Sequence, residues 1–175
     1  MKKLVLFLSM LLLVFGISAS ASAIGFDVNV TYTADNIVNA WWIDNGVSTP
    51  LGITANATQW WNADTKTISS LSYGTEYQIK WHLSDEGLSN SDAAGFIAMI
   101  ESSAPLSGNL LSSSFWEVSL DDTSWVAATE YGAYGSAPWY DGSSQGGDLS
   151  VFSSSGANWI WSSDNFLDER VYIRT

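Results

Sequence analysis

The chain has 175 residues, with 18 acidic side chains, 6 lysines and arginines, one histidine and no cysteine. These counts exclude a disulfide framework, a thiolate metal site and a cysteine nucleophile, and a net charge of −12 argues against nucleic acid as a partner because phosphates would be repelled. A hydrophobic fraction of 46% with ten tryptophans excludes an acidic disordered tail, which would be poor in aromatic residues.

The first 23 residues have the three parts of a secretory signal peptide. Lys2 and Lys3 form a basic start, residues 4–17 form an apolar run, and residues 18–23 are small and end in an Ala-Ser-Ala cleavage site. The apolar run is shorter than the ~20 residues that a membrane span needs, which disfavours the alternative of an uncleaved anchor. Cleavage predicts an exported domain of residues 24–175 without a transmembrane span, in the extracellular space or in the envelope or periplasm of a Gram-negative bacterium.

Alternating apolar and polar residues recur along the rest of the chain. Residues 26–32 alternate without interruption, and residues 37–43 follow as a more apolar strand. Asn45-Gly46 then supplies the positive φ angles of a tight hairpin turn. Further strands are expected at residues 47–53, 65–71, 76–83, 95–101, 115–120, 125–130, 149–152, 158–162 and 170–174.

This pattern predicts a single all-β domain. No window has the i, i+3, i+4, i+7 spacing of a helix over three turns. About nine or ten short strands separated by turns predict an antiparallel β-sandwich, most simply a jelly roll. A domain of ~150 residues buries roughly 70% of its surface, so it folds without disulfides. The chain ends within a strand pattern at residues 171–175, which predicts a domain truncated at its C-terminus.

Several phrases of the sequence occur together in a familiar order. They are VTYTADN at residues 30–36, GFIAMIE at 95–101, SSFWEVS at 113–119, WVAATEYGAYG at 125–135, NWIWSSDN at 158–165 and VYIRT at 171–175. In this order they resemble the secreted domain of bacterial PEP-CTERM proteins, and part of them looks like galactose-binding-domain-like jelly rolls. The resemblance implies export to the envelope, a link to exopolysaccharide production and a fold that often binds sugars. It brings no ligand-binding residues that could be transferred by position, and the family's sorting tail does not follow Thr175.

Tryptophan is the most over-represented residue type in the chain. An exposed aromatic ring can stack against the C–H face of a sugar, while neighbouring Asp, Asn and Gln side chains bond its hydroxyls. Two segments offer this combination, and their candidate residues are Trp60, Trp61, Asn62 and Asp64 in one segment and Trp139, Tyr140 and Asp141 in a long Gly/Ser-rich loop. The alternative is that these rings fill the core, as tryptophan commonly does in β proteins.

Carboxylates are the second group of candidates. Asp121, Asp122, Asp164 and Asp168 could supply oxygen ligands to a structural Ca²⁺, although ordinary Asx turns account for the same residues. A glycosidase needs two carboxylates that face each other across the substrate, and no pair stands out in the sequence. We therefore name no catalytic residue and expect a protein that is not an enzyme.

Together these features predict an exported, non-catalytic β-sandwich that binds carbohydrate or exopolysaccharide at the cell envelope. The main alternative is a structural or matrix-interaction protein without a small ligand, and a glycan-active enzyme is less favoured. Exposure distinguishes the first two, because a binding protein should present aromatic rings on one solvent-facing patch whereas a structural domain should bury nearly all of them.

Overall fold

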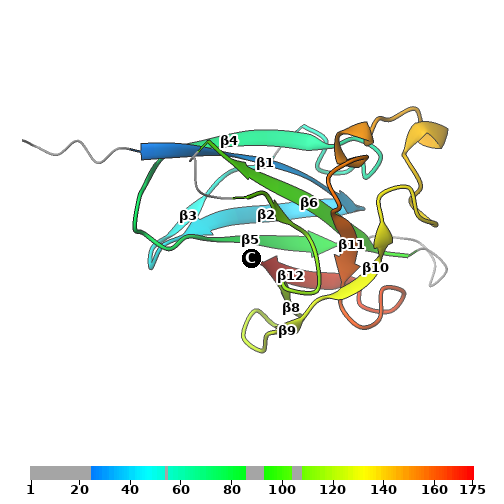
Figure 1. Cartoon of the computed structure of the whole chain (residues 1–175). Helices are drawn as coiled ribbons and strands as arrows, with labels where there is room; N and C mark the ends of the chain where they lie inside the picture. Colours follow the sequence, from blue (N-terminus) through cyan, green and yellow to red (C-terminus); the bar gives the residue numbers. More distant parts are fainter. Residues whose placement is uncertain (1–24, 54, 86–92, 104–107) are drawn as a thin grey trace, which may run out of the picture.

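The computed structural model describes residues 25–53, 55–85, 93–103 and 108–175, so the predicted signal peptide lies outside the described residues. The chain forms two antiparallel sheets of six strands each, which face one another (Figure 1). This arrangement confirms the predicted all-β antiparallel sandwich. Within the described ranges, no helix is long and apolar enough to cross a membrane.

The first sheet has the strand order β10-β11-β6-β1-β4, and β7 pairs with β6 beside this path. Its strands are β1 (Gly25–Asp35), β4 (Asp64–Ser72), β6 (Gly95–Ser102), β7 (Leu110–Leu111), β10 (Thr129–Ala133) and β11 (Asn158–Trp161). The second sheet has the order β3-β2-β5-β12-β8-β9. Its strands are β2 (Ile37–Asp44), β3 (Ser48–Pro50), β5 (Gln78–Ser84), β8 (Glu117–Ser119), β9 (Val126–Ala127) and β12 (Arg170–Arg174).

The structure confirms most of the predicted strands and corrects one of them. The predicted strand at residues 149–152 is wrong, because this segment holds a 3₁₀ helix, η2 (Ser150–Phe152). In a 3₁₀ turn, residues three apart lie on one side, which allows Leu149 and Phe152 both to be buried. A second 3₁₀ helix, η1 (Ser143–Gln145), lies in the long loop after β10, and the two-residue strand β7 was not predicted.

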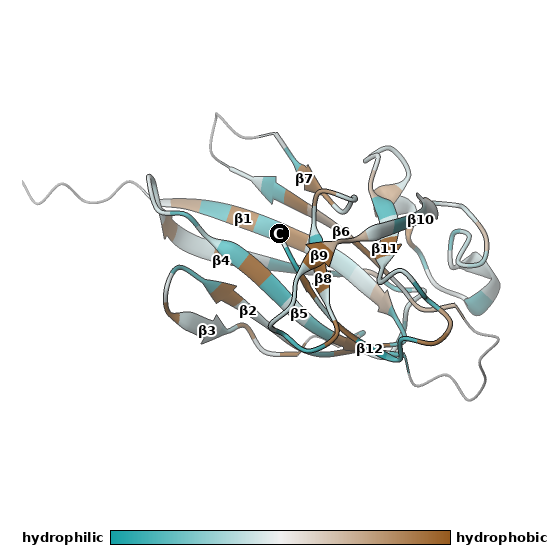
Figure 2. Cartoon of the chain, turned by 90° about the horizontal axis from the view of Figure 1, so that it is seen from below, coloured by the Kyte–Doolittle hydropathy of each residue, from teal (hydrophilic) through white to brown (hydrophobic). Residues whose placement is uncertain are grey.

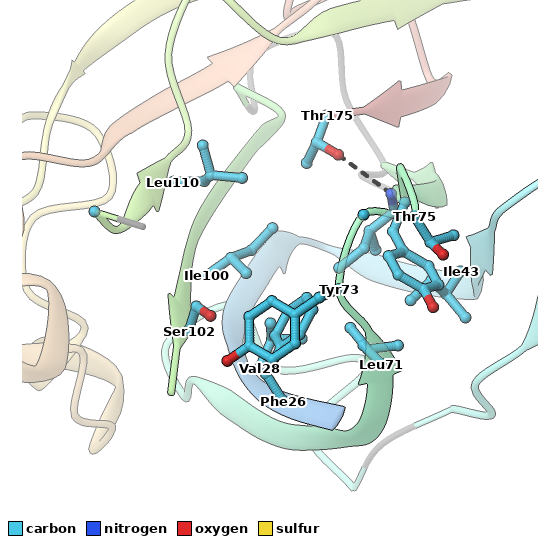
Figure 3. A pocket seen from close by; sticks show the side chains of 14 residues that line it. Phe26, Val28, Ile43, Leu71, Tyr73, Thr75, Ile100, Ser102, Leu110 and Thr175 are labelled. Atoms are coloured by element: carbon cyan, nitrogen blue, oxygen red, sulfur yellow. Dashed lines mark hydrogen bonds between the residues drawn. The ribbon is translucent and has the colours of Figure 1, made fainter. Parts of the chain in front are cut away.

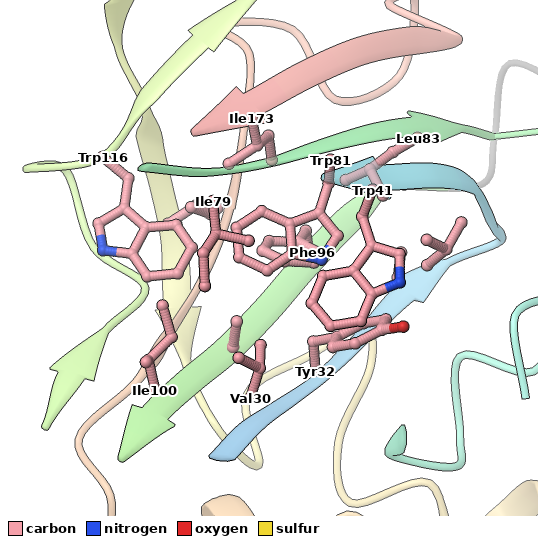
Figure 4. Packing of buried hydrophobic residues seen from close by; sticks show 14 of the residues in the cluster. Val30, Tyr32, Trp41, Ile79, Trp81, Leu83, Phe96, Ile100, Trp116 and Ile173 are labelled. Carbon is pink, nitrogen blue, oxygen red and sulfur yellow. The ribbon is translucent and has the colours of Figure 1, made fainter. Parts of the chain in front are cut away.

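Four of the ten tryptophans, Trp41, Trp81, Trp116 and Trp161, belong to the core between the sheets. Adjacent strand residues point to opposite faces, so Trp41 is fully buried while Trp42 lies on the outer face of the second sheet. The Trp81 ring stacks on Trp41 with centroids 5.9 Å apart and on Trp116 at 5.6 Å (Figure 4). Tyr32 of the first sheet packs against this row of indoles, with its ring centroid 5.0 Å from that of Trp41.

The outer face of the first sheet is also covered at β6. This strand is an exception, because along most strands hydrophilic and hydrophobic residues alternate (Figure 2). Strand β6 is buried on both faces over residues 95–100. On its outer face, Ile97 and Met99 belong to a second apolar cluster, which includes Trp139, Leu149, Phe152 and Trp159. The long loop between β10 and β11 therefore folds back over the first sheet and fixes the segment that carries the three candidate site residues Trp139, Tyr140 and Asp141.

Candidate functional site

A tight turn in the loop after β10 separates two residues that are adjacent in the sequence. Tyr140 donates its backbone N–H to the Ser136 carbonyl at 2.8 Å, and its φ of 47° lies in the left-handed region. Tyr140 is 57% exposed, whereas Trp139 is 1% exposed. The expectation of an exposed Trp139 ring is wrong, because the ring stacks on Trp159 and its Nε1 donates to Asp35 Oδ2 at 3.0 Å.

The other predicted segment, residues 60–64, runs from a turn into the first residue of β4. The ring of Trp60 is half-buried and meets Trp61 edge-on at a centroid distance of 5.9 Å. Asn62 donates its side-chain amide to Gln59 Oε1 at 2.9 Å, and Asp64 accepts from the backbone N–H of Asn56 at 3.0 Å. Asn62 and Asp64 thus stabilise their own turn, and Trp60 is the member of this set that reaches a hollow.

The structure brings the two predicted segments into contact with each other. Gly142 and Gly147 pack against Trp61, and Asn62 forms a parallel bridge with Asp148. A Cβ atom added at Gly147 would lie 2.0 Å from the Trp61 carbonyl oxygen, so only glycine allows this approach. Two stretches that are about 80 residues apart in the sequence therefore form one end of the molecule.

One side of the turn at residues 136–140 borders a hollow of about 570 Å³, which we call the Trp60 hollow. It is lined by Asp35, Asn36, Trp60, Ala93, Ala137, Pro138, Trp139 and Phe166. The ring of Phe166 is 49% exposed, and Asn36 donates its side-chain amide to Asp85 at 2.7 Å. The peptide bonds Asp35–Asn36 and Ala137–Pro138, which border the hollow, are both cis. The hollow thus combines aromatic rings with a carboxylate and an amide.

The other side of the same turn borders a second hollow, of about 530 Å³. It is lined by Tyr134, Gly135, Tyr140, Asp141, Ser143 and Ser144. Asp141 accepts from the Ser143 hydroxyl at 2.6 Å and from the Ser143 N–H at 3.0 Å, and these bonds lower the pKa of Asp141. Partial burial raises the pKa of Tyr134, and the charges of Asp141 and Asp148 act in the same direction. Tyr140 and Asp141 therefore face a different hollow from Trp139.

The four predicted Ca²⁺ ligands do not meet at one point. Asp121 accepts from the N–H groups of Thr123 and Ser124, and these bonds hold the pKa of Asp121 well below its usual range. Asp122 forms an ion pair with Lys80 at 2.9 Å. Asp164 likewise accepts from two backbone N–H groups of its own turn, while Asp168 and Asp121 line a shared hollow.

The contacts of Asp121 and Asp164 are the Asx-turn chemistry that the sequence offered as the alternative to metal binding. In the part of the chain that the structure describes, no group of three or more His, Cys, Asp or Glu side chains could hold a metal ion. The structural Ca²⁺ remains a prediction.

Sequence reasoning missed several residues of the Trp60 hollow. Asp35 and Asn36 were considered only as the end of the phrase VTYTADN, and neither Phe166 nor Pro138 was named as a candidate. The available signal was the pair of similar phrases TADN and SSDN, because one ends in Asp35-Asn36 and the other ends immediately before Phe166.

Comparisons with protein-family models, curated proteins and solved structures found no match for this chain.

Proposed function

We propose that the protein is an exported, non-catalytic β-sandwich that binds carbohydrate, with the Trp60 hollow as its glycan site. The observation that carries this proposal is the lining of one hollow by the half-buried Trp60 ring, the exposed Phe166 ring and the polar side chains of Asp35 and Asn36. Aromatic faces can stack on the C–H face of a pyranose. Carboxylate and amide groups beside them can bond its hydroxyls. The volume of the Trp60 hollow, about 570 Å³, lies within the range of small-ligand sites.

The charges at the Trp60 hollow favour an uncharged glycan. The described residues that line it include Asp35 and no lysine or arginine. The carboxylate of Asp35 can accept from sugar hydroxyls, but it would repel a uronate or sulfate group. The chain as a whole carries a net charge of −12, which adds to this repulsion. The proposed ligand is therefore a neutral polysaccharide of the cell envelope or extracellular matrix.

Other features bear on the two alternative functions. Trp41, Trp81, Trp139, Trp159 and Trp161 are fully buried, which is the pattern expected of a structural or matrix-interaction protein without a small ligand. For an enzyme, a glycosidase would need two carboxylates across the substrate, whereas the described lining of the Trp60 hollow contributes Asp35 alone. This lining supports binding over hydrolysis.

The test is a titration of the protein with a panel of soluble neutral and anionic polysaccharides, with and without Ca²⁺. Binding is followed by tryptophan fluorescence and by calorimetry. We expect a saturable change with at least one neutral polysaccharide, because Trp60 lies at the hollow. Phe166→Ala should then lower the affinity about tenfold, which corresponds to about 1.4 kcal/mol of binding free energy.

Phe115→Ala is the matched control, because Phe115 is 94% exposed and does not line the Trp60 hollow. Its affinity should equal that of the wild type. If both phenylalanine variants bind like the wild type, the glycan site lies elsewhere. If no polysaccharide binds to a protein that unfolds cooperatively, the structural alternative is favoured. Retention of binding and thermal stability in EDTA would exclude a role for Ca²⁺.

A further inference from the structure

A separate cavity of about 350 Å³ lies beside the start of β1 (Figure 3), away from the Trp60 hollow. Strand β1 connects the two places, because Phe26 and Val28 near its start line the cavity and Asp35 at its end lines the hollow. The cavity is bounded by both sheets, with Val28 and Ile100 from the first sheet and Ile43 and Ile79 from the second. It is therefore a gap in the apolar layer between the sheets.

At this end, the described side chains leave part of the space between the sheets unfilled. At the centre of the sandwich, Trp41 and Trp81 stack on each other and are fully buried. Around the cavity, the aliphatic side chains of Val28, Ile79 and Ile100 come from both sheets. The lining also includes three aromatic rings, those of Phe26, Tyr73 and Tyr77. Protein interiors are close-packed, so a gap of this size in an apolar layer is unusual and suits an apolar guest.

Two hydroxyl groups at the cavity wall are hydrogen-bonded within the protein. The Tyr77 hydroxyl accepts from the Ser72 N–H at 3.0 Å. The Thr175 hydroxyl accepts from the Ile79 N–H at 3.2 Å (Figure 3). The described lining contains no Asp, Glu, Lys, Arg or His. A ligand in this cavity would therefore gain from apolar burial and would find no charged side chain among the described lining residues.

We propose that this cavity binds an uncharged aliphatic chain, entering beside the exposed side chains of Tyr73 and Leu110. A cavity of about 150 Å³ holds a benzene ring, so about 350 Å³ accommodates roughly a dozen carbon atoms. Binding at this cavity is independent of binding at the proposed glycan site, because the cavity and the Trp60 hollow share no described lining residue. Loss of one therefore leaves the other intact.

The experiment measures binding of N-phenyl-1-naphthylamine to the protein, because the fluorescence of this probe rises in apolar surroundings. Unlabelled straight-chain alcohols of increasing length then compete with it. We expect saturable probe binding, and an affinity for the alcohols that rises with chain length up to about a dozen carbons and then levels off. Absence of probe binding, or an affinity independent of chain length, would overturn the proposal.

Val28→Phe places a larger side chain in the cavity and should weaken probe binding at least tenfold while the melting temperature stays at or above that of the wild type. Val126→Phe is the matched control, since Val126 is an exposed strand residue that does not line the cavity. It should bind the probe like the wild type. Ile100→Phe fills the same cavity from β6 and serves if Val28→Phe does not fold. A folded filling variant that binds normally, or an equal loss in Val126→Phe, would contradict the assignment.

Discussion

Trp139 stacks on Trp159, with ring centroids 4.7 Å apart and the ring planes inclined by 18°. Trp159 belongs to strand β11, whereas Trp139 comes from the long loop after β10. The stack therefore attaches the loop to the outer face of the first sheet. The stack also positions one wall of the Trp60 hollow, because Trp139 lines that hollow although its side chain is almost completely buried.

We predict that Trp139→Ala destabilises the protein by about 3–5 kcal/mol, the usual cost of removing a buried aromatic side chain. The ring loses its stack on Trp159, and Asp35 loses the Nε1 donor. Urea unfolding followed by circular dichroism measures the change in the free energy of unfolding. Phe115→Ala removes an exposed ring and should change this free energy by less than about 0.5 kcal/mol. Equal stability of the two variants would contradict the role assigned to Trp139.

Gly147 makes the contact between the loop and the Trp61 segment possible. Gly147→Ala should destabilise the protein by about 1–3 kcal/mol or more, because the added Cβ would collide with the Trp61 carbonyl oxygen. Gly108→Ala is the control, since a Cβ there meets nothing within 4 Å and the residue does not have a positive φ. When the two variants are measured side by side, the free energy of unfolding should be lower for Gly147→Ala than for Gly108→Ala. A neutral Gly147→Ala variant would show that the loop does not pack as described.

His82 gives the protein a pH dependence that can be assigned to one residue, because it is the only histidine. Partial burial lowers the pKa of His82, and the charge of Arg170 acts in the same direction, while Asp122 opposes them. The unfolded chain then takes up a proton at about pH 6.5, before the folded protein does. Stability should therefore fall as the pH decreases from about 7 to about 5.

The corresponding variant is His82→Asn, which retains a polar side chain without the titration. Its free energy of unfolding should change less with pH over the same range than that of the wild type. The measurement is a series of urea transitions between pH 5 and pH 7.5. Identical slopes for the two proteins would mean that another group causes the dependence.

Ser112 connects β6 to the start of β11 through its buried hydroxyl. The hydroxyl accepts from the Ala98 N–H at 3.0 Å and donates to the Asn158 carbonyl at 2.7 Å. Ser112→Ala should cost about 1–3 kcal/mol, because it leaves two buried backbone groups without this partner. Ser144→Ala changes an exposed serine and should be nearly neutral by the same thermal or urea unfolding measurement. If Ser112→Ala and Ser144→Ala changed the free energy of unfolding equally, the stabilising role assigned to the Ser112 hydroxyl would be wrong.

The sequence was sufficient to predict the strands because their signal is local. Alternation along residues 26–32 and the Asn-Gly turn after Ile43 each depend on neighbouring residues, and the predicted strand and hairpin both form, as β1 and as the β2–β3 hairpin. In the turn, Gly46 has the predicted positive φ and Asn45 does not. The error at residues 149–152 has a physical reason. A four-residue apolar segment fits both a strand and a 3₁₀ turn. The packing of Leu149 and Phe152 against the first sheet decides between the two conformations.

By itself, the sequence determined the fold class, the surplus of aromatic residues and the two segments in which aromatic and polar residues are neighbours. The tertiary structure decided that these two segments touch. Only the tertiary structure decided which rings are exposed. Trp139 and Tyr140 are neighbours in the chain, yet the turn between them buries one and exposes the other. Likewise, Asp35 and Phe166 reach the same hollow from distant positions. Asp35 pairs with Gly95 at the start of β6, and the neighbouring Ala94 donates its N–H to the Asn165 carbonyl, next to Phe166. Side-chain burial depends on long-range packing, whereas strand alternation depends on the residues next to each other.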